Sequence, residues 1–448
     1  MIPFKRDSLL GRHGWNWVWG GLGTNGSKKG GLLHSRLVAH SGKGISVAGL
    51  GGNRTGEMRF GRFLHNPKVT VEEMVATAKK RACAQVLGCH VLAIQDTSGL
   101  RVDEKGLGLS FHPVIAVDAD DGRMLGLIDN SFLARKGGAR AGRKQRSIEE
   151  KESWRWLEGA KSTAALAEAG AASVTVIADR EGDIYESFAF KPAGAELLVR
   201  AAQDRVLADG SRLFAKASGW DEAGRMSVDL PAIPGRKARR AQLSLRFGTV
   251  EIARPRHKQG GAELPKTLTL QVVDVREIDP PEGEEAAHWR LLTSHKIETA
   301  EDARRIVGFY RKRWTIEQVF RTMKTKGFRI EALRQQEEPL KKLVTAILIA
   351  AITVMQLVAE RDGAAARPLK DALGPEDVPV LEKVCESLEG KTQKQKNPHP
   401  KGSLAYAAWV FARLGGWNGY YGKPGPITMV RGLAEFHAIK RGWGLRDV

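Results

Sequence analysis

The sequence has few cysteines, no pattern typical of a secretory leader and no hydrophobic run of full membrane-spanning length. Its three cysteines, Cys83, Cys89 and Cys385, are too few and too scattered for a disulfide framework or a zinc cage. A reducing compartment, the cytoplasm, is therefore expected. Residues 1–15 lack a continuous apolar core after their basic residues, which argues against a secretory signal.

The longest uncharged stretch covers residues 343–359. It falls just short of the ~20 apolar residues that a membrane span needs, and it contains Thr345, Thr353 and Gln356. A buried helix of a globular domain is the preferred interpretation, and no membrane partner is expected. The sequence also shows no internal repeats.

Acidic residues are outnumbered by basic ones. Lys and Arg total 71 and Asp and Glu total 51, which leaves a formal net charge of +20. Hydrophobic residues make up 42% of the chain, enough to build a core and to exclude wholesale disorder. The charge indicates a polyanionic partner, most often nucleic acid, with a globular protein that is merely basic as the alternative.

The N-terminal region, residues 1–69, begins with a loop-like stretch rich in Trp and Gly. Towards its end, Arg59 and Arg62 alternate with Phe60 and Phe63. Basic residues interleaved with aromatics suit a contact that follows a DNA backbone. A small basic subdomain that packs its own aromatics fits these residues equally well.

The next region, residues 70–336, has the pattern of a mixed α/β domain. Capping-box pairs predict helices over 70–87 and 147–169, and a further helix begins near 181–188. Short apolar or alternating runs predict strands at 90–95, 108–120, 122–129, 173–178 and 196–201, with a turn at Asp121-Gly122 between the second and third.

A long segment, residues 203–287, interrupts this pattern with alternating runs and prolines, which predicts an inserted β-rich subdomain. A strand over 288–294 and a long helix follow, and Thr299 and Asp302 form the capping pair of that helix. Residues 337–448 are predicted to be mainly helical. The chain thus divides into regions 1–69, 70–336 and 337–448.

Three carboxylates stand out as candidates for catalysis. Asp96 and Asp179 each follow a predicted strand, at the edge where open α/β sheets place their sites. With Glu317 on the long helix, they could hold two Mg²⁺ ions about 4 Å apart for an in-line displacement at phosphorus. Capping of a following turn is the alternative role for either aspartate.

The long helix presents further polar groups on one side. At ~100° per residue, Tyr310, Arg313, Glu317 and Lys324 fall within a stripe about 60° wide. Arg313 and Lys324 are suited to phosphate contact. A solvated face with pairing between residues four apart is the alternative.

These residues resemble the signature of the cut-and-paste DDE transposases of bacterial insertion sequences, in the insertion-sequence-four family typified by the transposon-five transposase. The signature Y-R-E-K is Tyr310, Arg313, Glu317 and Lys324 with the family's spacing. The motifs LAIQDTS around Asp96 and ADREGDIY around Asp179 resemble its two aspartate blocks. Similarity extends to EEKESWRWL, to GEEAAHWRLLTS and to KGSLAYAAWVFARLGGW.

The resemblance implies an RNase H-like core with the β-rich insertion, an N-terminal region that binds element ends and a helical C-terminal domain that dimerises or contacts DNA. It implies that Asp96, Asp179 and Glu317 bind Mg²⁺ or Mn²⁺, two ions per site. The implied reaction proceeds through nicking, hairpin formation, hairpin opening and strand transfer. Expected DNA contacts are Tyr310, Arg313, Lys324, Arg180, Arg321, Arg59, Arg62 and Trp289, the last stacking on a flipped base.

Two segments depart from the family pattern: the Trp- and Gly-rich start, residues 1–34, and the strongly basic segment 135–147. The basic segment is either a DNA contact or a solvated tip. A homodimeric transposase acting on double-stranded DNA is the leading hypothesis. A stand-alone metal-dependent nuclease and a non-catalytic repressor derived from a transposase are the alternatives.

Overall fold

The computed structural model of the 448-residue chain contains two compact units. One unit comprises residues 82–317, and the other combines residues 1–81 with residues 318–448. The N- and C-terminal regions, which the sequence predicts as separate regions, thus belong to one unit. The described residues are 33–38, 40, 45–102, 108–134, 148–230, 237–256, 264–324, 327–333, 337–364, 366–420 and 422–443.

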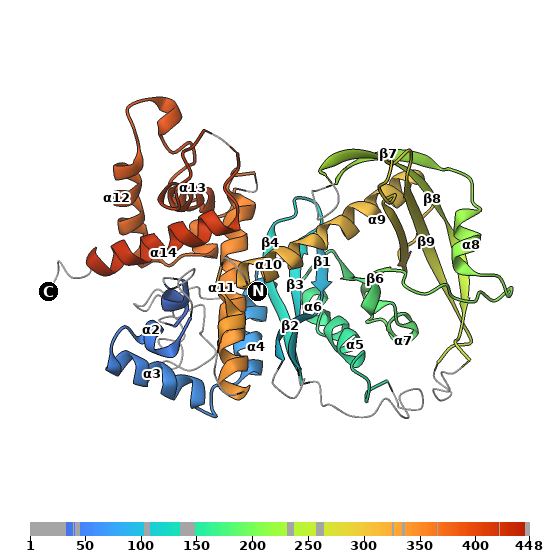
Figure 1. Cartoon of the computed structure of the whole chain (residues 1–448), viewed down its shortest axis with the longest axis horizontal. Coiled ribbons are helices and arrows are strands. Elements are labelled where there is room, and N and C mark those ends of the chain that lie inside the picture. Colours follow the sequence, from blue (N-terminus) through green and yellow to red (C-terminus); the bar gives the residue numbers. More distant parts are fainter. Residues whose placement is uncertain are drawn as a thin grey trace, which may run out of the picture. The chain divides into compact units, whose positions relative to one another are not determined.

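A ten-stranded mixed sheet forms the core of the unit of residues 82–317 (Figure 1). The strand order is β2-β3-β1-β5-β6-β10-β9-β8-β7, and β4 pairs with β3. The strands are β1 (His90–Gln95), β2 (Ser98–Val102), β3 (Gly108–Asp118), β4 (Met124–Ala134), β5 (Ser173–Ala178), β6 (Ala195–Arg200), β7 (Gly224–Leu230), β8 (Arg239–Ala253), β9 (Thr267–Glu277) and β10 (His288–Thr293).

The strands β1 and β5 lie at the centre of this sheet and have the bounds that the sequence predicts. They run parallel, with Ile94 paired with Ile177. Both are buried over nearly their whole length, which explains why each is a continuous apolar run rather than an alternating one. Because the two strands are parallel, their carboxyl ends lie at the same edge of the sheet.

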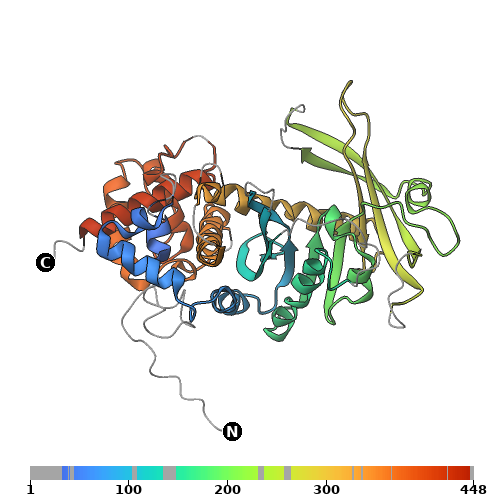
Figure 2. The same ribbon diagram turned by 60° about the horizontal axis from the view of Figure 1, so that its bottom comes forward.

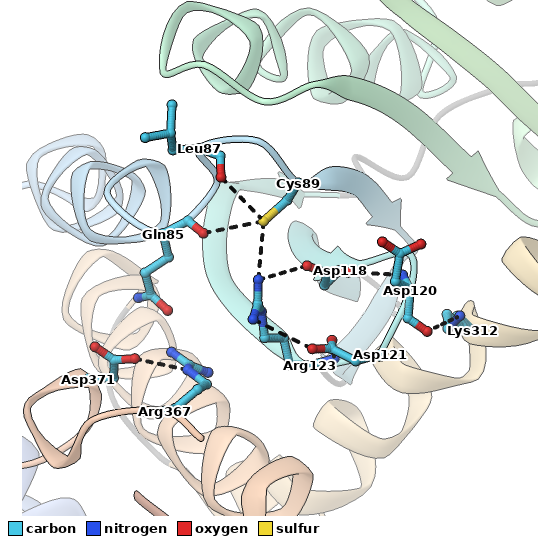
Figure 3. A network of polar contacts seen from close by, with 10 residues as sticks. All are labelled: Gln85, Leu87, Cys89, Asp118, Asp120, Asp121, Arg123, Lys312, Arg367 and Asp371. Carbon is cyan, nitrogen blue, oxygen red and sulfur yellow. Dashed lines mark hydrogen bonds and ion pairs between the residues drawn. The ribbon is translucent and has the colours of Figure 1, made fainter. Parts of the chain in front are cut away.

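The predicted hairpin is formed by β3 and β4, which pair antiparallel on either side of the turn at Asp121-Gly122. Gly122 has a φ of 75°, a left-handed conformation that glycine adopts without steric cost. Arg123 stabilises the turn through ion pairs with Asp118 and Asp121, and it also donates to Cys89 Sγ over 3.2 Å (Figure 3). All three cysteines are free thiols, in agreement with the absence of a disulfide framework.

The helix predicted over 147–169 differs from the observed structure. Ser147 lies outside the described residues, and 148–153 form turns, so the first helix is α5 (Trp154–Lys161). It is separated from α6 (Ala164–Glu168) because the hydroxyl groups of Ser162 and Thr163 donate to the carbonyls of Gly159 and Ala160 and interrupt the ladder. With α7 (Tyr185–Ala189), these helices pack their apolar side chains on one face of the sheet.

The predicted insertion, residues 203–287, contains β7, β8 and β9 and also a helix, α8 (Leu213–Ser218). Its strands do not form a separate sheet. β9 pairs antiparallel with β10, with Val275 opposite Trp289, and β10 pairs with β6. The insertion therefore extends the central sheet. The alternating pattern thus correctly predicts strands in this segment. It does not predict that β9 pairs with β10 of the core sheet.

The long helix predicted after Thr299 begins with the predicted capping box, in which Thr299 and Asp302 cap each other. It consists of two segments, α9 (Ala300–Lys312) and α10 (Trp314–Met323), which meet at Arg313. In Figure 2, α9 (gold) and α5 (green) lie on opposite sides of the strands. At the end of α9, Lys312 donates to the carbonyl of Ala119 and, as Figure 3 shows, to that of Asp120 in the β3–β4 turn.

The other unit is helical. Its elements in the described residues include α2 (Val47–Gly51), α3 (Arg54–His65), most of α4 (Val71–Cys83), α11 (Glu337–Glu360), α12 (Val378–Leu388), α13 (Leu404–Leu414) and α14 (Pro426–Trp443). The helix α11 is long and apolar enough to cross a membrane, but 94% of its apolar window is buried inside the protein, against α3, α13 and α14 (Figure 1). It is the core helix of this unit, as the sequence predicts.

Candidate catalytic site

Two aspartates lie next to each other at the carboxyl edge of the sheet. Asp96 directly follows β1 and Asp179 directly follows β5, its parallel neighbour. The negative charge of Asp179 contributes to a raised pKa of Asp96, which shows that the two carboxylates are in electrostatic reach of each other. The structure thus brings together the two strand-end residues that the sequence singles out.

The carboxyl group of Asp96 is strongly perturbed. Burial raises its pKa from 3.8 to about 6, and the charge of Asp179 acts in the same direction. The Arg313 guanidinium and the hydrogen bond from the Thr97 N–H act in the opposite direction. Because burial and a like charge both penalise the ionised form, a cation beside Asp96 would stabilise it.

Both aspartates also accept a local backbone N–H, and Asp179 thereby takes the alternative role of capping a turn. Asp179 Oδ1 accepts the N–H of Glu181 over 2.8 Å and caps the short turn of residues Arg180–Gly182. Asp96 Oδ1 accepts the N–H of Thr97 over 2.7 Å. Each of these hydrogen bonds uses one carboxylate oxygen, which leaves the second oxygen for another contact.

Arg313 links Glu317 to this pair. Its Nη1 donates to Asp96 Oδ2 over 3.0 Å, and its Nη2 donates to Glu317. The guanidinium carbon also lies 5.9 Å from the centre of the Tyr310 ring, which is buried. Arg313 and Glu317 thus form the pairing between residues four apart that was the alternative, and the contact of Arg313 with Asp96 and the burial of Tyr310 join this side of the helix to the sheet edge.

The carboxylates suit a hard divalent cation. Carboxylate oxygens are the ligands that Mg²⁺ and Mn²⁺ prefer, and Mg²⁺ is commonly held by one or two carboxylates with waters and substrate phosphates. In the described part of the chain, no three His, Cys, Asp or Glu side chains converge closely enough to form a metal cage by themselves. The position of Arg313 between Asp96 and Glu317 explains this, because one positive charge already lies between them.

A groove of about 1340 Å³ adjoins this cluster and shares Tyr310 and Arg313 with it. Its wall contains two tryptophans, Trp289 from β10 and Trp314 from the start of α10. Three acidic residues also line it: Asp229, Glu284 and Glu285. Basic side chains predominate, and they are Arg180, Arg200, Arg290, Arg311, Lys312 and Arg313. The groove combines the charge that binds phosphates with aromatic surfaces that bind bases.

Trp289 is a partly exposed member of this wall and not a core residue. The sequence did not predict several other members, among them Trp314 and Arg200. Trp314 is 46% exposed, and its place directly after Arg313 was the available signal. Arg200 ends β6, and burial lowers its pKa; nothing in its local sequence distinguishes it from other arginines.

Two further predicted DNA contacts, Arg321 and Lys324, belong to the unit that contains residues 318–448. Arg321 is exposed, and Lys324 Nζ lies 4.0 Å from Glu331 Oε1. The predicted stripe therefore divides: its first three members meet the aspartates within one unit, and Lys324 pairs within the other.

The candidate DNA contacts Arg59 and Arg62 lie on α3 and are exposed. Phe60 and Phe63, which alternate with them, are buried in the helical unit. The aromatics thus pack internally, and the arginines are left on the surface. The start of the chain, residues 1–32, and the basic segment 135–147 lie outside the described residues.

A comparison with known protein families agrees with this geometry. The family described as "Transposase DDE domain" matches residues 110–353, which is more than half of the chain. The match includes Asp179 and Glu317 and begins after Asp96, which lies beside Asp179 in the folded protein.

Proposed function

We propose how this chain acts from one premise: it belongs to the DDE transposase family, and it is therefore an enzyme that cuts and rejoins DNA phosphodiester bonds. Enzymes of this family use divalent metal ions, and their catalytic domain has an RNase H-like α/β core. The mixed sheet of residues 82–317 is the part of this chain that fits such a core.

In our proposal Asp96, Asp179 and Glu317 hold Mg²⁺ or Mn²⁺, two ions per site. One observation carries this assignment: two aspartates end neighbouring parallel strands, and Arg313 connects Asp96 to Glu317. When bound, such ions activate water or a 3′ hydroxyl and stabilise the leaving oxygen. The burial that raises the pKa of Asp96 favours its contact with a cation.

The groove residues would hold the DNA. Arg180 and Arg313 would contact phosphates at the scissile position, which their place in the groove wall supports, and the Arg313 guanidinium lies over the Tyr310 ring. Trp289 offers a partly exposed ring on which a flipped base can stack, an interaction worth about 1–3 kcal/mol. This supports the finer proposal of cut-and-paste transposition with a hairpin intermediate, as in the insertion-sequence-four family.

The remaining regions have proposed roles that follow the same analogy. Residues 1–69 would bind element ends through exposed groups such as Arg59 and Arg62, and residues 337–448 would contribute to dimerisation and DNA contact. Arg321 and Lys324 would contact DNA beyond the catalytic cluster. The protein would act in the bacterial cytoplasm as a homodimer on the DNA of the nucleoid.

The test is a cleavage assay on a labelled DNA fragment carrying the ends that flank the gene, with Mg²⁺, analysed on denaturing gels. Asp179→Asn should lower cleavage by roughly a thousandfold or more and leave end binding intact, because it removes metal-binding charge and not a DNA contact. Asp209→Asn is the matched control. Like Asp179, Asp209 accepts the N–H of the residue two positions later, here Ser211 over 2.9 Å, but it lies outside the groove.

The products distinguish the alternatives. Hairpins and joined products that disappear in Asp179→Asn support cut-and-paste transposition. Nicks without joining would indicate a stand-alone nuclease. Tight end binding with no cleavage in Mg²⁺ or Mn²⁺ would indicate a repressor and would contradict the proposal.

A further inference from the structure

One side chain of helix α5 contacts the segments that carry both aspartates. Arg155 Nε donates to Thr97 Oγ1 over 2.9 Å, and Thr97 directly follows Asp96. Its Nη2 donates to Glu181 over 2.7 Å, in the turn that Asp179 caps. The Arg155 side chain is only 11% exposed, so its contact with Thr97 is largely shielded from water, whereas Glu181 is 64% exposed. One guanidinium thus connects the end of β1 to the end of β5.

The contact with Thr97 belongs to a closed chain of hydrogen bonds with one consistent direction. Because Thr97 Oγ1 accepts from Arg155, its O–H donates to His112 Nδ1 over 2.9 Å. His112 Nε2–H then donates to Gln95 over 3.1 Å, and Gln95 donates to the carbonyl of Trp156 over 3.3 Å. The chain leaves α5 at Arg155 and returns to it at Trp156.

This arrangement requires a neutral His112, and its surroundings provide one. Burial lowers the pKa of His112 to about 3, and the positive charge of Arg155 acts in the same direction. The His112 ring also packs edge-on against Trp156, with ring centres 4.7 Å apart. The hydrogen-bond directions are therefore the same throughout the neutral pH range.

Close packing fixes the position of α5 against both aspartate segments. A Cβ added at Gly159 would lie 2.3 Å from Gln95 Oε1, and one added at Gly182 would lie 2.5 Å from the Cβ of Ala178 and 3.2 Å from the Trp156 ring. Two glycines thus allow the helix, the Gln95 side chain and the Asp179 turn to approach one another. Small displacements of α5 would be transmitted to both segments.

We infer that Arg155 is a positioning residue that sets the separation of Asp96 and Asp179 by bridging Thr97 and Glu181. The inference rests on the proposed function, because it assumes that these two aspartates share metal ions. Removing a group that orients metal ligands through hydrogen bonds commonly lowers metal affinity or activity 10–100-fold. Its contacts with Thr97 and Glu181 are what distinguish Arg155 as such a residue.

The experiment measures Mn²⁺ binding to the metal-free full chain by titration calorimetry. Arg155→Met keeps an apolar stem of similar length but removes all donors, and we expect it to weaken Mn²⁺ affinity by about 10–100-fold. Arg155→Lys can reach only one of the two partners at a time and should fall between Arg155→Met and the parent. Asp179→Asn serves as the reference for loss of a proposed ligand.

The matched control is Lys161→Met. Lys161 also lies on α5 and forms an ion pair with Glu158 over 2.9 Å, but it contacts neither aspartate segment. It should bind Mn²⁺ as the parent does. If Arg155→Met retains the parental Mn²⁺ affinity while Asp179→Asn loses it, the inference about Arg155 is overturned and the proposed function stands. If Asp179→Asn also binds as the parent does, the proposed function fails and the inference fails with it.

A second readout separates positioning from a general loss of folded protein. The Mn²⁺ concentration that gives half-maximal cleavage should rise in Arg155→Met by the same factor as the dissociation constant. A purely structural role would lower the maximal rate in proportion to the folded fraction and would leave the half-maximal concentration unchanged. That second result would overturn the inference.

Discussion

Arg313 places one positive charge between two carboxylates, because its two terminal nitrogens donate to Asp96 and to Glu317. In the metal-free protein this charge offsets the repulsion between the acidic groups and lowers the pKa of Asp96. It also occupies the region that a divalent cation would share. The same guanidinium is proposed to contact a DNA phosphate.

Replacing Arg313 by Ala should therefore increase the stabilisation that Mn²⁺ gives to the DNA-free protein. Unscreened carboxylates bind the ion more tightly, and tighter binding to the folded state raises the melting temperature further. We expect the Mn²⁺-induced shift to exceed the parental one by roughly 2–4 °C for each kcal/mol of added binding energy. Differential scanning fluorimetry with and without MnCl₂ provides the measurement.

Arg311→Ala is the control for this variant. Arg311 lines the same groove, but in the described residues it forms no ion pair with Asp96 or Glu317. It should show the parental shift. An equal shift in Arg313→Ala and the parent would mean that the guanidinium does not compete with the metal.

Helix α5 illustrates how an element gains its role from what it packs against. Its glycine, Gly159, faces Gln95 and Val114 in the strands below. Gly308 in α9 is also in a helix interior, but a Cβ there would meet no atom within 4 Å. The two glycines thus have the same local conformation and opposite surroundings.

Replacing each glycine by Ala should have opposite effects on stability. Gly308→Ala gains helix propensity and should stabilise the protein by up to about 1 kcal/mol. Gly159→Ala forces the Gln95 side chain to move and should destabilise it by roughly 1–3 kcal/mol, the usual cost of overpacking. Hydrogen exchange of the strand amides in the unit of residues 82–317 reports both effects. Equal stabilisation by the two substitutions would show that α5 is packed loosely.

At the scale of the whole molecule, both units contain histidines that are neutral when folded. Burial lowers the pKa of three of them, His34, His112 and His437, to about 3, and that of His295 to about 4. In the unfolded chain each would take up a proton near pH 6.5. The net charge of +20 further lowers the stability of the folded state at acid pH, because additional protons increase the repulsion between positive charges.

The free energy of unfolding should therefore fall as the pH drops below 6.5. The unfolded state then binds more protons than the folded state, and each such histidine contributes roughly 1 kcal/mol per pH unit until its folded pKa is reached. Asp96, whose folded pKa of about 6 lies above its ordinary value, acts in the opposite sense between pH 6 and 4, but the histidines outnumber it. Urea midpoints at pH 7.5 and 5.5 provide the measurement.

His112→Gln tests the origin of this loss. It should reduce the pH dependence, while His65→Gln, at an exposed position on α3, should leave it unchanged. A urea midpoint that is the same at both pH values would contradict the assignment of neutral buried histidines.

Much of the site could be predicted because its parts are encoded locally. The apolar runs of β1 and β5 are short and end at acidic residues, so strand bounds and the places of Asp96 and Asp179 follow from neighbouring residues alone. The capping pair Thr299 and Asp302 likewise acts within one helical turn. Helical spacing then relates Arg313 to Glu317.

Contacts between distant segments were decided only by the tertiary structure. The sequence predicted a helix from Ser147, but its start at Trp154 depends on the turns before it and on packing. Whether the inserted strands extend the core sheet depended on the pairing of β9 with β10. The bridge from Arg155 to Thr97 and Glu181 joins three segments that are far apart in the chain.

The sequence by itself therefore determined the central strands, the acidic residues that follow them and the capping pair of the long helix. The tertiary structure decided which side chains meet. Arg313 lies between two carboxylates, Arg155 contacts Thr97 and Glu181, and Trp314 lines the groove. The physical reason is the distance along the chain over which each interaction acts. Hydrophobic periodicity and capping act over a few residues, whereas hydrogen bonds and ion pairs between elements depend on the packing of the whole unit.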